Sequence, residues 1–187
     1  MKQTKTISTK RIAVAGLMAA LTVVGSALRI TLPLSIAGTT SFHLGNIACA
    51  LSGILLGPWL GGLAAGLGSA IYDIMNPAFI SECWLTFLTK GAYGVVAGLV
   101  MGKGAFRYWR SILATGAGAL TYAVLYLLKS YFYSGLFEQG LTPDAAMLTV
   151  IGKVPATVFN AVIALICAPI LASAIGKALE KNRLTLE

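Results

Sequence analysis

Six long apolar runs limit what this chain can fold into. They lie at residues 12–28, 44–57, 59–75, 83–102, 111–137 and 148–176. A helix needs about 17 to 25 apolar residues to cross a bilayer, and most of the runs reach that length. Only 11% of the residues are charged, whereas a soluble domain has roughly 25%. The sequence therefore predicts an all-α membrane protein, with six transmembrane helices in a single domain over residues 1–187.

Details of the runs qualify this prediction. The second and third runs are short, and the Gly57-Pro58 pair separates them. The first run has neither a small-residue cleavage pattern nor a polar segment after it, so we expect it to remain as a span.

The three cysteines, Cys49, Cys83 and Cys167, lie in apolar runs without CxxC spacing. This placement favours buried free thiols over disulfides or a metal site.

The net charge of +8 follows the topology. Basic residues cluster before the first run, between the fourth and fifth, and after the sixth: Lys2, Lys5, Lys10, Arg11, Lys103, Arg107, Arg110, Lys177, Lys181 and Arg183. With six spans these segments share one side of the membrane, which the positive-inside rule makes cytoplasmic. We expect a cytoplasmic N-terminus over residues 1–11 and a cytoplasmic tail over 177–187. The basic excess is then topological and does not indicate nucleic acid.

Four ionisable residues remain inside the runs or at their edges: Asp73, Lys90, Lys129 and Lys153. Such residues are costly in hydrocarbon and indicate function. At 1.5 Å per residue, each lysine lies about 12 to 13 Å below an acidic residue at the outer end of its own helix. The three lysines therefore share one depth. Because only two acids, Asp73 and Glu82, lie near them, an anionic ligand is favoured.

Polar stripes with helical spacing accompany the lysines. The stripes are Glu82, Thr86, Lys90 and Tyr93; Tyr122, Tyr126, Lys129 and Tyr133; and Thr149, Lys153, Thr157 and Asn160. Lipid could not satisfy these groups, so they must face one another or water. We expect them to converge on a polar pocket for a small molecule. Its expected lining is His43, Asp73, Asn76, Glu82, Trp84, Thr86, Lys90, Tyr126, Lys129, Tyr133, Lys153 and Asn160.

A structural interpretation of the same residues stays open. The stripes could form interhelical hydrogen bonds, with the lysines reaching the membrane surface or pairing with Asp73 or Glu82. His43 alone fits a hydrogen bond within the protein better than a ligand contact. Trp84 lies two positions from Glu82, so it would stack on a planar ligand only if its indole turns inward.

The first run carries two adjacent ridges of small residues, Ala15 with Ala19 and Gly16 with Ala20. Small residues four positions apart let membrane helices approach closely. The run has almost no polar stripe, so a ridge on it could serve an external protein partner.

The sequence has no nucleotide-binding motif that could power transport. The nearest approach to a Walker A loop is AGLVMGKG at residues 97–104, which has Ala97 where the first glycine belongs and Gly104 where Ser or Thr belongs. We also find no catalytic constellation and no cofactor motif. We therefore expect a transport subunit rather than an enzyme, with the energy supplied by a partner.

These segments resemble the substrate-binding S components of energy-coupling factor (ECF) transporters for vitamins and other micronutrients. The resemblance covers essentially the whole chain, through AGLMA at 15–19, FHLGN at 42–46, ILLGPWLGGLAAGLG at 54–68 and ECWLTFLTKGAYG at 82–94. The turn sequence that begins LGP after the second run is its most telling part.

The resemblance implies a prokaryotic cell-membrane protein of six helices, with a ligand pocket in the outer half. The loop after the first helix would cover this pocket, and the last three helices would line it. Ala15 and Ala19 would dock onto a membrane coupling protein, the T component, which carries two ATPase subunits that use the ATP. Riboflavin, thiamine, pantothenate, folate, pyridoxine, cobalamin and queuosine precursors are all possible ligands.

Two other function classes remain open from the residues alone. An intramembrane enzyme could use Asp73, Glu82 or His43 for acid or base chemistry. A self-contained channel or ion-coupled carrier could use the lysines as a selectivity ring.

Overall fold

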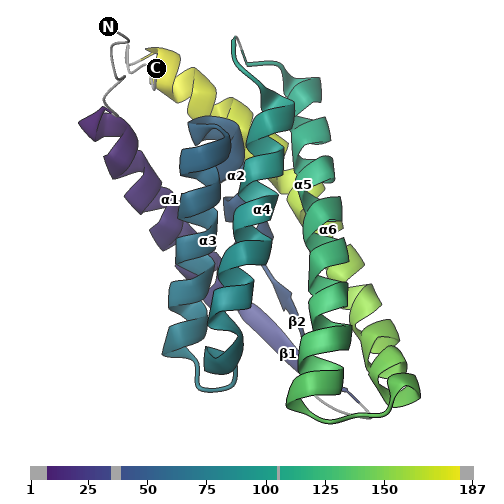
Figure 1. The fold of residues 1–187 in the computed structure, drawn as a ribbon. Helices are drawn as coiled ribbons and strands as arrows, with labels where there is room; N and C mark the ends of the chain where they lie inside the picture. The colour runs from purple at the N-terminus through teal and green to yellow at the C-terminus, as the bar shows by residue number, and fades with distance from the viewer. Residues whose placement is uncertain (1–7, 35–38, 105, 182–187) are drawn as a thin grey trace, which may run out of the picture.

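The computed structural model describes residues 8–34, 39–104 and 106–181, and most of them are helical (Figure 1). The α-helices of this described part are α1 (Thr9–Ala27), α2 (Gly45–Leu56), α3 (Pro58–Met75), α4 (Cys83–Met101), α5 (Tyr108–Lys129) and α6 (Pro143–Lys181). Lys2, Lys5 and Arg183, on which part of the topology prediction rests, lie outside the described residues.

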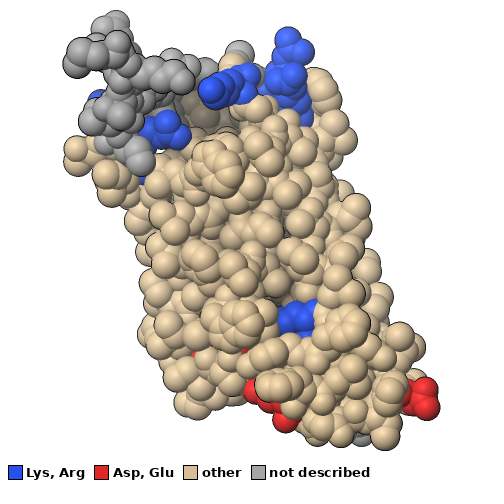
Figure 2. Space-filling model, viewed as in Figure 1, with Lys and Arg blue, Asp and Glu red and all other residues tan. Residues whose placement is uncertain are grey.

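Four helical segments are long and apolar enough to cross a membrane: Thr9–Ala27, Ile80–Met101, Tyr108–Glu138 and Pro143–Ala178. The apolar helix α2 is shorter. The start of α1 and the end of α6 lie at the same end of the molecule (Figure 1). Lysine and arginine side chains gather at that end, and acidic side chains gather at the opposite end (Figure 2). This distribution is typical of a multi-pass membrane protein.

Glycine allows helices α2, α3 and α4 to pack with their backbones in contact. A Cβ atom on Gly53 would overlap the carbonyl oxygen of Gly94, and one on Gly98 would overlap the backbone of Gly57 and Pro58. Helix α1 meets α3 in the same way, because a Cβ on Gly68 would overlap the carbonyl oxygen of Ala19. The core of the bundle is therefore formed by close backbone approach, as expected where lipid gives no hydrophobic drive for helix association.

An antiparallel hairpin follows α1, where the sequence predicts a loop. Strand β1 (Arg29–Pro33) pairs with β2 (Thr39–His43), with Arg29 opposite His43 and Pro33 opposite Thr39. Alternation over five residues is too short to distinguish a strand from a loop in the sequence. The all-α prediction is therefore correct for the membrane helices and wrong for this segment.

Two irregularities shape the helices that flank the cavity. A π-helical segment, η2 (Ser130–Glu138), continues α5, and a 3₁₀ turn, η1 (Ile80–Glu82), precedes α4. Helix α6 contains Pro155 and Pro169 but runs through both. Such interruptions are tolerated in membrane helices when neighbouring groups satisfy the freed backbone, and π-helical turns often mark functional sites.

Candidate ligand-binding site

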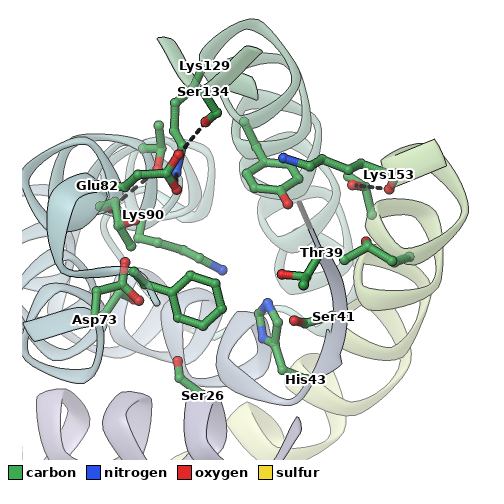
Figure 3. A pocket seen from close by; sticks show the side chains of 18 of the residues that line it. Ser26, Thr39, Ser41, His43, Asp73, Glu82, Lys90, Lys129, Ser134 and Lys153 are labelled. Carbon is green, nitrogen blue, oxygen red and sulfur yellow. Dashed lines mark hydrogen bonds and ion pairs between the residues drawn. The ribbon is translucent and has the colours of Figure 1, made fainter. Parts of the chain in front are cut away.

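A polar cavity of about 280 Å³ lies beside the hairpin (Figure 3). The hairpin lies toward the end of the molecule opposite the start of α1 and the end of α6 (Figure 1). The hairpin contributes to its wall, together with α3, η1, α4, α5, η2 and α6. Of the predicted site residues, those that line it are His43, Asp73, Glu82, Thr86, Lys90, Tyr126, Lys129, Lys153 and Asn160. Residues far apart in the sequence thus converge on one cavity.

Three predicted residues do not line the cavity. Trp84 is 52% exposed, and its ring packs edge-on against Tyr133 at 5.7 Å, so its indole is turned away from the cavity. The hydroxyl of Tyr133 contacts the carbonyl oxygen of Ser81 at 3.5 Å instead. Asn76 acts locally after α3, donating to the Tyr72 hydroxyl and accepting from the backbone N–H of Ala78. Trp84 lies beside the predicted stripe of Glu82, where a shift of one or two positions turns a side chain outward. Tyr133 was assigned to a stripe by α-helical spacing, but it lies in the π-helical segment Ser130–Glu138, where that spacing does not hold.

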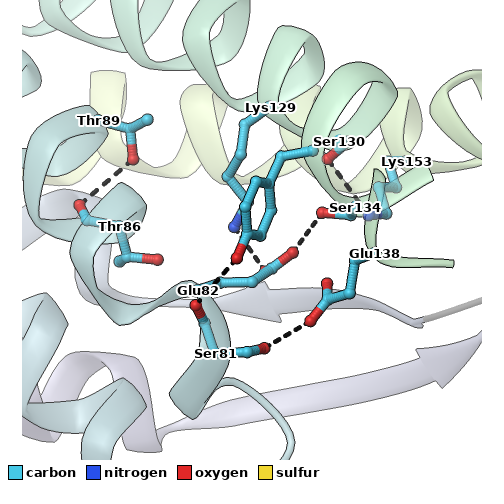
Figure 4. A network of polar contacts seen from close by, with 10 residues as sticks. Ser81, Glu82, Thr86, Thr89, Lys129, Ser130, Ser134, Glu138 and Lys153 are labelled. Atoms are coloured by element: carbon cyan, nitrogen blue, oxygen red, sulfur yellow. Dashed lines mark hydrogen bonds and ion pairs between the residues drawn. The ribbon is translucent and has the colours of Figure 1, made fainter. Parts of the chain in front are cut away.

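An ion pair joins η1, which precedes α4, to the end of α5. The Nζ of Lys129 lies 2.6 Å from a carboxylate oxygen of Glu82, and the hydroxyl of Ser134 donates to the other oxygen (Figure 4). Nearby, the Ser81 hydroxyl donates to Glu138 at 2.7 Å. The π-helical segment brings Ser134 and Glu138 to this network, which satisfies both oxygens of the half-buried Glu82 carboxylate.

The other two lysines have neutral partners. Lys90 donates to the side-chain carbonyl of Asn46, and its ammonium lies 3.9 Å from the ring centre of Tyr122. Lys153 donates to the hydroxyl of Ser130 at 3.2 Å. Both lysines are buried, with exposed fractions of 4% and 7%.

Two tyrosines of α5 lie between the lysines. The rings of Tyr122 and Tyr126 stack at 5.5 Å, and the ammonium groups of Lys129 and Lys153 lie 5.8 Å and 5.7 Å from the centre of Tyr126. Aromatic faces attract cations, so these rings help to stabilise the buried ammonium groups. The three lysines therefore surround one aromatic surface within the cavity.

Asn160 connects helix α6 to the hairpin. Its side-chain oxygen accepts the backbone N–H of His43 at 2.9 Å, and its side-chain nitrogen donates to the carbonyl oxygen of Ser41 at 2.8 Å. The amide thus hydrogen-bonds the backbone N–H and carbonyl groups on the unpaired edge of β2, as a neighbouring strand would. Asn160 lines the cavity, but its amide is occupied in positioning the hairpin.

His43 also has a structural contact. Its Nδ1 accepts the backbone N–H of Gly45 at the start of α2, at 3.2 Å. Burial, reinforced by the charges of Lys90 and Arg29, lowers the pKa of His43 well below its ordinary value. The neutral imidazole suits the role of hydrogen-bond acceptor.

Arg29 and the polar residues of β2 also line the cavity, although they were not predicted as site residues. The guanidinium of Arg29 lies over the rings of Tyr72 and Phe79, at 4.3 Å and 4.8 Å, and donates to the carbonyl oxygen of Ser26 at 2.8 Å. Thr39 and Ser41 line the cavity with His43, and Figure 3 shows all three facing it. The alternate positions 39, 41 and 43 were the available signal, because alternate residues of a strand share a face.

The two small-residue ridges of α1 face different surroundings. Ala15 and Ala19 are half-buried and pack against the protein core, and Ala19 contacts α3. Gly16 and Ala20 are exposed. Ala15 and Ala19 thus keep part of their surface accessible beside the core, and Gly16 and Ala20 form the more exposed ridge.

Comparison with known proteins agrees with this arrangement. A family model described as ECF-type riboflavin transporter, S component, matches residues 6–177. A protein of Pyrococcus woesei, described as an uncharacterized protein in gap 3′region, is 33% identical over 116 residues, which are 62% of this chain and 74% of that protein. The chain is therefore a member of the ECF-type riboflavin transporter S component family, a family of substrate-binding transporter subunits.

Proposed function

We propose that this chain captures a vitamin or related micronutrient for an ATP-driven ECF importer. The observation that carries the proposal is the polar cavity, because it gathers charged and aromatic side chains from the hairpin and from helices α3 to α6. A cavity with a few convergent polar groups is the usual form of a small-molecule site. The family description names riboflavin, which makes flavins the first ligands to test.

We further propose that the cavity faces the outside of the cell. In this orientation the basic end of the molecule lies in the cytoplasm, as the positive-inside rule favours (Figure 2). All six α-helices would then lie in the plasma membrane of a prokaryote, with α2 and α3 as the shortest spans, and both termini would be cytoplasmic. The ligand would enter from the side that carries the hairpin.

Energy would come from partner subunits. A membrane coupling protein and two ATPases would complete the importer, and the coupling protein would contact the exposed ridge of Gly16 and Ala20. Gly16 suits close approach, because no atom lies within 4 Å of a Cβ built on it.

Reconstitution in vesicles tests this proposal. The purified chain is incorporated alone, or with a coupling protein and two ATPases, and uptake of radiolabelled riboflavin and other vitamins is measured with and without internal ATP. We expect uptake only when the partners and ATP are both present. Uptake by the chain alone without ATP would contradict the proposal and support a self-contained carrier.

A further inference from the structure

Two buried ammonium groups in the cavity have unused hydrogen-bonding capacity. A lysine ammonium carries three N–H donors. Within the described residues, the Nζ of Lys90 has one hydrogen bond, to Asn46, and the Nζ of Lys153 has one, to Ser130. Each group therefore keeps two donors without an acceptor among the described residues, and Figure 3 shows the Lys90 ammonium pointing into the open space.

The charges of the cavity are also unbalanced. Its lining contains four basic side chains, Arg29, Lys90, Lys129 and Lys153, and three carboxylates, Asp73, Glu82 and Glu138. Among the described residues, the ion pair of Lys129 with Glu82 is the one contact between a lysine and a carboxylate within 4 Å. Glu138 accepts from the Ser81 hydroxyl, and no ion pair joins Asp73 to Lys90.

Burial makes this imbalance costly for the protein alone. A charge removed from water is tolerated when it is paired and hydrogen-bonded. The tyrosine faces offset part of the cost for Lys90 and Lys153, but they do not accept the remaining N–H donors. A bound carboxylate or phosphate would supply both the charge and the acceptors, through charge-assisted hydrogen bonds.

We propose that the ligand of this cavity carries an anionic group, a phosphate or a carboxylate, which Lys90 or Lys153 binds beside the Tyr122 and Tyr126 rings. This inference rests on the proposed ligand-binding function and narrows its substrate class. Riboflavin itself has no such group, so the cavity favours anionic forms over neutral vitamins. The charges of Lys129 and Glu82 already neutralise each other, and this ion pair forms a fixed part of the cavity wall.

Matched ligand pairs test the proposal. Equilibrium binding to the detergent-purified full chain is measured for riboflavin and its 5′-phosphate, for pyridoxine and its 5′-phosphate, and for pantothenol and pantothenate. The members of each pair differ in the presence of the anionic group. We expect the wild-type chain to bind the anionic member of at least one pair about 10- to 100-fold more tightly, the range expected for hydrogen bonds to charged groups.

Variants assign that preference to the lysines. At least one of the variants Lys153→Met and Lys90→Met should remove most of the preference, whereas Lys153→Arg and Lys90→Arg should retain it because the charge remains. Lys103→Met is the matched control, since Lys103 is an exposed lysine outside the cavity. Because the preference is first measured in the wild-type chain, the test stands even if a methionine variant fails to fold.

The outcomes separate this inference from the proposed function. Tight binding of neutral riboflavin, pyridoxine or pantothenol without preference for the anionic member would overturn the inference and leave the vitamin-binding function intact. A preference that survives both methionine variants would overturn the role of the lysines. Binding of no member of any pair would contradict both proposals for this set of vitamins.

Discussion

At the scale of single residues, buried charges define the cavity, and their partners decide what each one does. Spacing along the helices predicted that Lys90, Lys129 and Lys153 share a depth, and the structure places all three around one cavity. Spacing could not predict which lysine pairs with Glu82, because side chains of this length reach several neighbours. The ion pair forms with Lys129, since Ser134 of the π-helical segment holds the second carboxylate oxygen.

Breaking this ion pair should destabilise the protein. Glu82→Gln leaves the Lys129 ammonium, which is 7% exposed, without a carboxylate, and the free energy of unfolding should fall by about 3 kcal/mol. The measurement is reversible denaturant unfolding in detergent. The double variant Glu82→Gln/Lys129→Met should recover much of the loss, because no unpaired charge remains. Additive effects of the two changes would show that the pair does not stabilise the fold.

His43 should make stability depend on pH. Its pKa is lower in the folded protein than its ordinary value of about 6.5, so the unfolded chain takes up the proton first. Stability should therefore be complete above pH 6.5 and decrease as the pH falls below it. His43→Asn keeps an acceptor for the Gly45 N–H but does not titrate, so its melting temperature should change less between pH 7.5 and 5.5. Equal slopes for both proteins would exclude His43 as the source.

At the scale of elements, periodicity identified the long helices but not the irregular segments between them. The hairpin has strands of only five residues, and its polar positions 39, 41 and 43 alternate too briefly to identify a strand. The ridges of α1 show a different limit. Ala15 with Ala19 and Gly16 with Ala20 are equivalent in the sequence, and only the contact with α3 determines which ridge is the more exposed.

Glycines at helix contacts should tolerate no side chain. Gly98→Ala places a methyl group against the backbone of Gly57 and Pro58, and overpacking of this kind should cost about 1 to 3 kcal/mol. Gly116→Ala is the control, because its Cβ would lie 3.6 Å from a Leu165 methyl group, an ordinary contact. Thermal unfolding in detergent should show a lower melting temperature for Gly98→Ala alone. Equal melting temperatures would contradict the close packing of α3 and α4.

The exposed ridge of α1 should matter for coupling and not for ligand binding. Gly16→Trp projects its indole away from the bundle, so the folded chain should bind ligand normally. It should nevertheless lose ATP-dependent uptake in vesicles, because the indole would separate α1 from the coupling protein. Trp substituted at Leu120, an exposed position on α5, is the control and should leave uptake unchanged. Normal uptake with Gly16→Trp would exclude this ridge as the docking surface.

At the scale of the whole molecule, the chain has a binding cavity at one end and a basic surface at the other (Figure 2). The apolar runs and the distribution of charge predicted that the two ends of the molecule differ. Apolar residues favour the hydrocarbon core of the membrane, and basic residues favour its cytoplasmic side. The identity of the ligand was not predictable, since it depends on side-chain positions set by the hairpin and the π-helical segment. The central claim is that the isolated chain captures a small molecule in this cavity.

The most direct test is mass spectrometry of the small molecules released when the detergent-purified protein is denatured. The protein is prepared from cells supplied with the vitamins named above, and any empty sites are filled by adding the same compounds before washing. We predict a vitamin-like compound in nearly stoichiometric amount. At least one of the variants Lys90→Met and Lys153→Met should retain much less of it. A wild-type protein that retains none of these compounds, before or after their addition, would contradict the account.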